Sequence, residues 1–460
     1  MKKNARHNKS HIIFYGGARS VTGSHFMLQS AGVKIAVDCG FFQGCEICGA
    51  KNRELFPYDV KMVDVLFITH AHLDHIGRIP SFVKQGFRGV IYSTEPTRDI
   101  AELMFTDSMR VLAREAKRQG VEPAYSEEDV RQVMALWKGV QYNQKLKLPG
   151  GFEATLKDNG HILGSSMVEI VRGTRKLVFT GDLGNSPSPL LRESEKVTDA
   201  DYMVIESVYG DRTHESAEER KKKLYEAIKH TAKNRGVLMI PAFSIERTQE
   251  MLFELHNMMK HEKMEPMPVF LDSPLAIGVT EIYEKYKSYL NSSALEHSTH
   301  ADDLFRFPEL TFTRRGRESA KIASAPYPKI IIAGSGMSNG GRITRHEEKY
   351  LPDKRNMLLL VGYQAPGTLG RELQDGAKNV TINDNPVVVR AEVVTIDGYS
   401  AHMDSEGLLD FVEASADKLE RVFVVQGEPK AAFFFVQRVQ DYLDVPAEAP
   451  EEGSRVEINL

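Results

Sequence analysis

The sequence predicts an α/β protein with more than one domain. Between Ile12 and Val37, short apolar runs are separated by glycines, as in a β-meander. After Gly210 the pattern changes, because strand-like runs then alternate with long amphipathic helices. That alternation is typical of a doubly wound parallel sheet. A chain of 460 residues is also too long for one ordinary domain.

The composition is that of a globular protein without a strong electrostatic signature. Hydrophobic residues make up 42% and charged residues 27% of the chain, and the formal net charge is −4. A nucleic acid would therefore have to be bound by a local basic cleft rather than by the surface as a whole. No apolar run approaches the length of about 20 residues that crosses a bilayer.

Three cysteines are typical of a reducing compartment. We therefore expect a cytoplasmic protein with no membrane partner. Cys45 and Cys48 could form a metal or redox site, although a lone Cys-x-x-Cys supplies only two ligands.

The densest chemical signal follows the apolar run 63–68, which reads as a buried strand. Four metal-ligand side chains fall within six positions there: His70, His72, Asp74 and His75. Imidazole and carboxylate groups bind Zn²⁺ at roughly 2.0–2.2 Å. At a strand end that opens into a turn, His70 and His72 can point the same way, whereas a helix would separate them. The sequence therefore predicts one group of donors for a metal and a second group beside it. A polar turn with solvent-facing histidines is the alternative, and it does not account for so dense a spacing.

Further acidic and histidine residues follow other predicted strands. They lie at or just beyond strand ends, at Asp38, His161, Asp182 and Glu206. Each has an ordinary explanation when taken singly, such as a polar turn. In layered α/β proteins, however, strand ends converge on one edge, where sites are usually built. We therefore expect these residues and His70 to share one site.

A glycine-rich loop follows another strand-like run, 330–333. Its backbone N–H groups could bind phosphate oxygens, with Arg342 as a charged clamp. The candidate substrate-binding residues are Ser335, Gly336, Gly340, Gly341 and Arg342. Glycine loops also occur simply as tight turns, so this alternative stays open.

The last part of the chain is predicted to return to the first domain near Gly376. Residues 387–396 read as a strand that ends shortly before His402. A helix is expected over 405–413 and a strand over 421–425. The acidic, proline-containing tail from Pro446 onward is expected to be frayed.

In their order along the chain, these residues resemble the motifs of the metallo-β-lactamase superfamily. Within it they are similar to the β-CASP nucleases, relatives of the cleavage and polyadenylation endonuclease. The first four motifs are matched by Asp38, the run from His70 to His75, His161 and Asp182. Glu206, in Glu-Ser-Val-Tyr-Gly, and His402, in Ser-Ala-His, look like two β-CASP motifs. The glycine loop and the segment 367–370 are also similar to that group, and the match runs over nearly the whole chain.

The resemblance implies an αββα sandwich with an inserted doubly wound α/β domain. Residues 1–210 and 377–460 would form the metallo-β-lactamase domain, and residues 211–376 the β-CASP domain. The inserted domain would cap the metal edge and leave a cleft that admits a single strand more readily than a duplex. Relatives often form dimers, so a homodimer is also implied.

The resemblance also implies a zinc-dependent ribonuclease. His70, His72 and His161 would hold one zinc ion, and Asp74 and His75 a second, with Asp182 bridging them. Hydroxide shared by the two ions would attack a phosphorus of single-stranded RNA, and His402, oriented by Glu206, would protonate the leaving oxygen. Asp38 would orient a ligand or the water.

One position departs from the family pattern. Gln426 stands where the family usually has a histidine that binds the second zinc ion. A neutral amide oxygen is a poorer Zn²⁺ ligand than imidazole, so the second site is expected to be weak. The alternatives are therefore an RNA-binding pseudoenzyme, or a small-molecule metallohydrolase acting on thioesters or lactams.

Overall fold

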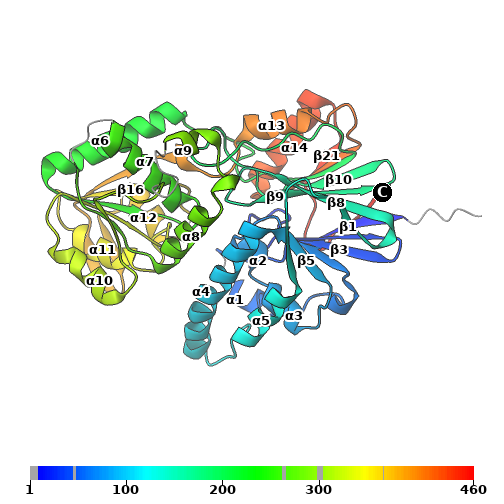
Figure 1. The fold of residues 1–460 in the computed structure, drawn as a ribbon, viewed down its shortest axis with the longest axis horizontal. Coiled ribbons are helices and arrows are strands. Elements are labelled where there is room, and N and C mark those ends of the chain that lie inside the picture. The colour runs from blue at the N-terminus through cyan, green and yellow to red at the C-terminus, as the bar shows by residue number, and fades with distance from the viewer. Residues whose placement is uncertain (1–8, 45–47, 262–265, 298–303, 366) are drawn as a thin grey trace, which may run out of the picture. The chain divides into compact units, whose positions relative to one another are not determined.

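A computed structural model describes residues 9–44, 48–261, 266–297, 304–365 and 367–460. The predicted site at Cys45 and Cys48 lies outside the described residues, because 45–47 are not among them. Figure 1 shows the fold with its elements labelled. The chain forms two compact units. One contains the described parts of 1–186, 193–213 and 402–460, and the other those of 187–192 and 214–401.

The first unit is built on two sheets, each of seven strands within the described part of the chain. The first sheet has the order β22-β1-β2-β3-β4-β5-β6 and the second the order β21-β20-β11-β10-β9-β8-β7. The strands of the first sheet are β1 (Ser10–Gly16), β2 (His25–Ser30), β3 (Val33–Val37), β4 (Val65–Phe67), β5 (Val90–Thr94), β6 (Trp137–Val140) and β22 (Arg455–Ile458). Those of the second are β7 (Leu146–Lys147), β8 (Phe152–Asp158), β9 (Ser166–Arg172), β10 (Arg175–Phe179), β11 (Tyr202–Glu206), β20 (Arg421–Val425) and β21 (Ala447–Glu448).

Helices complete the first unit. Five follow the strands of the first sheet: α1 (Cys48–Lys51), α2 (Leu73–Ile76), α3 (Ile79–Lys84), α4 (Glu95–Gln119) and α5 (Glu127–Leu136). Two others, α13 (Ser405–Glu413) and α14 (Pro429–Leu443), lie against the second sheet (Figure 1). The arrangement is the predicted αββα sandwich.

The alternation of side chains along β11 explains the layers. Tyr202 and Val204 belong to the core between the two sheets, whereas Met203 and Ile205 pack with the residues of α13 and α14. Successive side chains of a strand point to opposite faces, so the apolar residues 202–205 of β11 can be covered on both sides. The second sheet therefore packs on the first sheet with one face and on α13 and α14 with the other.

The second unit contains a six-stranded sheet among its described residues, in the order β14-β13-β15-β12-β16-β19. Its pairs are parallel, as predicted for this region. The strands are β12 (Val237–Pro241), β13 (Val269–Leu271), β14 (Leu310–Phe312), β15 (Lys329–Ala333), β16 (Met357–Leu360) and β19 (Glu392–Thr395), with a separate hairpin of β17 (Asn379–Ile382) and β18 (Asn385–Val388). The helices are α6 (Ala217–Asn234), α7 (Arg247–His261), α8 (Pro274–Lys285), α9 (Ser292–His297), α10 (Gly316–Lys321), α11 (Ile343–Tyr350) and α12 (Leu369–Gln374).

The second unit ends later than the sequence predicted. The predicted return to the first domain near residue 377 differs from the structure, in which the second unit continues to Ala401. The reason is that β19 completes the parallel sheet by pairing with β16, from Met357↔Glu392 to Leu360↔Thr395. The segment 387–396 is also divided between β18 and β19 rather than forming one strand.

The prediction of a frayed tail is wrong. β22 pairs antiparallel with β1, with Ser10 opposite Ile458, and Ile458 is buried in the core between the sheets. The acidic composition of the tail did not reveal this pairing, because the partner strand lies at the other end of the chain. In the described residues, no helix has the length and apolar character needed to span a bilayer.

Candidate metal centre

The predicted ligands of the first unit lie where strands of the two sheets end. His70 follows β4, Asp182 follows β10, and His161 lies in the loop between β8 and β9. The two sheets approach closely here, since the N–H of Ser166 donates to the carbonyl oxygen of Thr69 at 2.7 Å. Gly181 permits this approach, because its φ is +55° and a Cβ there would lie 2.7 Å from Thr69 Cβ.

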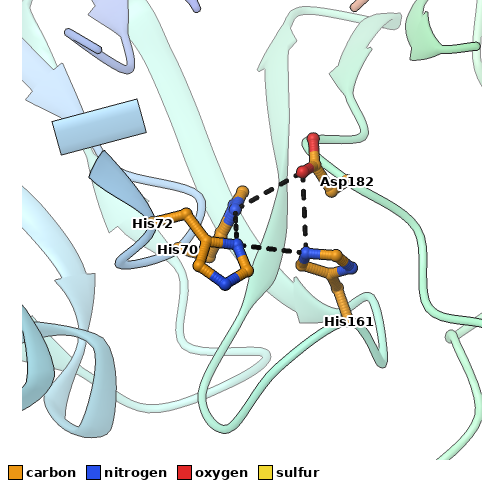
Figure 2. Close-up of side chains that lie close together, drawn as sticks. All are labelled: His70, His72, His161 and Asp182. Carbon is orange, nitrogen blue, oxygen red and sulfur yellow. Dashed lines mark hydrogen bonds and ion pairs between the residues drawn. The ribbon is translucent and has the colours of Figure 1, made fainter. Parts of the chain in front are cut away.

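Four side chains converge at this edge (Figure 2). His70 Nε2 lies 3.1 Å from His72 Nδ1 and 3.5 Å from Asp182 Oδ2. His161 Nε2 lies 3.3 Å from His72 Nδ1 and 3.6 Å from Asp182 Oδ2. The four ligand atoms all lie within 4.8 Å of one another, so one cation could contact all of them. Segments far apart in the sequence therefore meet in one group, which we call the four-ligand group.

The electrostatics favour neutral imidazoles beside a carboxylate. Burial lowers the pKa of His70, and the neighbouring His75 lowers it further. Burial also lowers the pKa of His72, to about 3. Burial opposes ionisation of Asp182, but His75 and His70 hold its pKa well below the usual range. Neutral imidazoles offer the lone pairs that zinc binds, and the carboxylate supplies negative charge.

Asp38 lies behind His75. Its Oδ2 accepts from His75 Nδ1 at 2.7 Å and from the Thr69 hydroxyl at 2.8 Å, and its Oδ1 accepts from the Thr69 N–H at 2.8 Å. The side chain is fully buried and the backbone has a left-handed φ of 57°. Because a carboxylate only accepts, it fixes the proton of His75 on Nδ1 and turns Nε2 toward Asp182.

His25 and Tyr58 hold Asp38 in turn, and the sequence interpretation missed both. His25 Nδ1 donates to the carbonyl oxygen of Asp38 at 2.5 Å, and His25 Nε2 accepts from the Tyr58 hydroxyl. His25 is 4% exposed and lies among aromatic rings, including Phe56 and Phe82. The only signal is the pairing of β2 with β3, which sets His25 beside Asp38 and requires the register to be known.

The burial of His25 predicts a pH-dependent stability. Burial lowers the pKa of His25 from 6.5 to about 4, against the opposing effect of its hydrogen bond to Asp38. The unfolded chain therefore binds a proton at higher pH than the folded protein, so this contribution is complete above pH 6.5 and is lost as the pH falls toward 4. Between about pH 7.5 and about pH 5 the metal-free protein should lose about 2 kcal/mol of unfolding free energy from this group.

Urea unfolding of the metal-free protein at the two pH values measures this loss. His25→Asn is the matched variant, because its amide can still donate to Asp38 but does not titrate. A variant that loses as much stability as the wild type would contradict the assignment to His25.

The second predicted group lies beside the first. His75 Nε2 is 3.3 Å from Asp182 Oδ1 and 4.0 Å from Asp74 Oδ2. Gln426, in the loop after β20, reaches the same place, with its Nε2 2.7 Å from Asp182 Oδ1. Burial raises the pKa of Asp74, partly offset by His75. The structure thus brings all seven predicted metal ligands to one edge of the first unit.

Glu206 and His402 form a further group with Asp182. Glu206 ends β11 and is fully buried, and its Oε1 accepts from the Leu183 N–H at 2.6 Å. Both of its oxygens lie 3.2 Å from His402 Nδ1, and His402 Nδ1 lies 3.8 Å from Asp182 Oδ2. Although burial alone would lower it, the Glu206 carboxylate raises the pKa of His402 to about 9. The Glu206 carboxylate therefore favours the protonated ring.

The glycine loop belongs to the second unit and follows β15. The loop closes on itself, since the N–H of Ser335 donates to Gly340 O at 3.2 Å and a Cβ on Gly341 would lie 2.3 Å from Gly334 O. Gly336 packs under the ring of Phe243, whose Cδ2 would lie 2.7 Å from an added Cβ. Substrate binding by this loop stays a prediction.

Arg342 differs from the predicted phosphate clamp. Its guanidinium donates to Asp272 Oδ1 at 2.7 Å, to Thr313 O at 2.8 Å and to Arg314 O at 2.9 Å. Asp272 is fully buried and also accepts from His346. Arg342 therefore anchors the loop to neighbouring strands. The sequence did not reveal this role because the acceptors come from other segments.

Three imidazoles and one carboxylate are a donor set that zinc takes in hydrolytic sites, so the four-ligand group fits this ion. An αββα sandwich with such a group at its strand ends defines a metal-dependent hydrolase of the metallo-β-lactamase type.

Comparison with known proteins places the chain more closely. Residues 27–205 match the metallo-beta-lactamase superfamily domain, 248–373 the Beta-Casp domain, and 386–450 the Zn-dependent metallo-hydrolase RNA specificity domain. The chain is 35% identical to Ribonuclease TTHA0252 of Thermus thermophilus, over 91% of this chain and 93% of that protein. It is 30% identical to the RNase J-like protein of Methanocaldococcus jannaschii, over 96% and 98%.

The transcription termination factor FttA of the same archaeon is also 30% identical, over 93% of this chain and 68% of that protein. A crystal structure of a protein of unknown function from Enterococcus faecalis shares the fold. Its TM-score is 0.54 at 12% identity, over 98% of this chain and all of that one. The chain belongs to the β-CASP family of zinc-dependent metallo-β-lactamase-fold hydrolases.

Proposed function

We propose that this protein is a ribonuclease that hydrolyses phosphodiester bonds of single-stranded RNA, by endonucleolytic cleavage. The observation that carries the proposal is that the four-ligand group and the Glu206–His402 pair share one carboxylate, Asp182. A metal position and a proton donor would therefore adjoin, and both can contribute to hydrolysis of a phosphodiester. The RNA specificity domain matched by 386–450 and the name of Ribonuclease TTHA0252 support RNA as the substrate.

The four-ligand group would hold the zinc ion through His70 Nε2, His72 Nδ1, His161 Nε2 and Asp182 Oδ2. Zinc bound there supplies Lewis acidity toward a phosphoryl oxygen and makes water a usable nucleophile near neutral pH. Asp74, Asp182 and His75 lie beside this position, where the resemblance implies a second and weaker metal site.

Side chains of this protein would donate and accept the protons of the reaction. Glu206 holds Nδ1 of His402, so the opposite ring nitrogen, Nε2, would donate a proton to the leaving oxygen. Asp74 would accept a proton from the attacking water, because burial raises the pKa of its carboxyl group while the side chain is still 20% exposed. Asp38 would keep His75 oriented through the hydrogen bond to Nδ1. In the second unit, the glycine loop would bind the RNA backbone. The resemblance alone supports a homodimer.

The test is cleavage of end-labelled RNA by the zinc-loaded protein, with a chelated sample as the control. We expect internal cleavage of a single strand, slower cleavage of the same sequence as a duplex, and none after chelation. Products that grow only from one end would change the proposal to exonuclease activity. RNA binding without zinc-dependent cleavage would indicate a pseudoenzyme. Hydrolysis of a thioester or a lactam but not of RNA would indicate a small-molecule metallohydrolase.

A further inference from the structure

The carboxamide of Gln426 contacts two of the groups that a second metal ion would need. Its Nε2 lies 2.7 Å from Asp182 Oδ1 and 3.1 Å from His75 Nε2. Asp182 Oδ1 and His75 Nε2 are themselves 3.3 Å apart. One NH₂ group therefore lies against both of them. It contacts Oδ1 of Asp182, whereas Oδ2 of the same carboxylate lies beside His70 and His161 of the four-ligand group.

The orientation of His75 is fixed from behind. Asp38 Oδ2 accepts from Nδ1 of this ring, so Nε2 faces Asp182 and Gln426. When His75 is neutral, Nε2 carries a lone pair that accepts an N–H of Gln426. When His75 is charged, its Nε2–H donates to Asp182, and Gln426 donates to the same carboxylate. In both states an N–H group lies where a second metal ion would have to bind the lone pairs of Asp182 Oδ1 and His75 Nε2.

The side chain of Gln426 is held in this position. It is 2% exposed, and its backbone N–H donates to Gly17 O at 2.6 Å with a left-handed φ of 50°. A Cβ added to Gly17 would lie only 3.4 Å from Gln426 Cγ, so the Gly17 backbone packs closely against the Gln426 side chain. Turning the amide over would set its oxygen against the Asp182 carboxylate, and two acceptors at that distance repel each other. The carboxylate thus selects the orientation with nitrogen inward.

We propose that the Gln426 carboxamide takes the place of the second metal ion, so that the protein binds one zinc ion, at the four-ligand group. The inference rests on the proposed function, because it concerns the metal that this function uses. A second zinc ion would have to break both contacts of the amide and turn its oxygen inward. The ligand that zinc would then bind is the amide oxygen of Gln426, which is weaker than imidazole.

The experiment is a zinc titration of the chelated protein, with the bound metal counted after equilibrium dialysis. Wild type should bind one zinc ion per chain tightly. Gln426→His supplies an imidazole at a left-handed position that histidine tolerates, and should bind a second ion at least tenfold more tightly than wild type does. Gln426→Leu removes the two donors without adding a ligand, and should also bind the second ion more tightly than wild type.

A matched control separates the site from an added histidine. Gln141→His places the same side chain on an exposed residue outside the site and should leave the stoichiometry at one. The proposal is overturned if wild type binds two zinc ions with similar affinity. It is equally overturned if neither Gln426 variant gains affinity for a second ion.

RNA cleavage by the same samples keeps this inference apart from the proposed function. Wild type that binds two ions and cleaves RNA would refute the one-zinc inference and retain the ribonuclease. Wild type that binds one ion and does not cleave RNA would retain the one-zinc inference and refute the ribonuclease.

Discussion

His402→Gln should lower the rate of single-stranded RNA cleavage by about 10²- to 10⁴-fold, the range that a positioned general acid contributes. Glutamine fills a similar volume but cannot transfer a proton. The four-ligand group does not include His402, so the zinc content should be that of wild type. The measurement is the single-turnover cleavage rate at saturating RNA, together with metal analysis of the same sample.

Two further variants make this result specific. His11→Gln, on β1, changes a histidine outside the site and should leave cleavage unchanged. Glu206→Gln removes the carboxylate that raises the pKa of His402 to about 9. Because His402 must be protonated to act, the rate falls as the pH rises through its pKa. The alkaline limb of the pH–rate profile should therefore move to lower pH in Glu206→Gln. Cleavage by His402→Gln at the wild-type rate would remove this residue from the mechanism.

Asp182→Asn should weaken zinc binding strongly and remove most of the cleavage activity. The carboxylate lies against His70 and His161 through Oδ2 and against His75 through Oδ1, so it connects every group at this edge. An amide of the same shape keeps the volume but removes the negative charge. We expect zinc affinity to fall more than about 100-fold, beyond the loss typical of a residue that only supports a ligand. Equilibrium dialysis against zinc, followed by the cleavage assay, measures both effects.

Asp201→Asn is the matched control for Asp182→Asn. Asp201 is also buried, at 2% exposure, but pairs with Arg175 and Lys418 instead of the histidines. Its variant should lose stability and keep its zinc. An Asp182→Asn protein that retains wild-type zinc affinity would show that this carboxylate is not a ligand.

Local signals in the sequence were sufficient for many elements. The helix over 405–413 was predicted with the bounds of α13, and the strand over 421–425 with those of β20. The side chain of Asp404 caps α13 by accepting from the Gly407 N–H, so the residues that start this helix are adjacent to it. After the exposed Arg421, residues 422–425 of this strand are a continuous apolar run, and such a run can be buried on both faces of a sheet.

Other elements depended on partners far along the chain. β22 is ordered because it pairs with β1, and β19 extends the second unit because it pairs with β16. Neither short segment has an apolar pattern strong enough to indicate a sheet position alone. Pairing between distant strands is decided by the register and by the burial that the whole fold provides.

The sequence by itself determined the family, the kinds of ligand, and their positions after strands. These follow from residue type and spacing over a few positions, which any folded arrangement of the chain retains. Only the tertiary structure decided which atoms meet. It directed Arg342 to Asp272, set His25 behind Asp38, and turned the Gln426 amide between His75 and Asp182. Hydrogen bonds act over about 3 Å, and the partners in each of these contacts become neighbours only when the sheets have assembled.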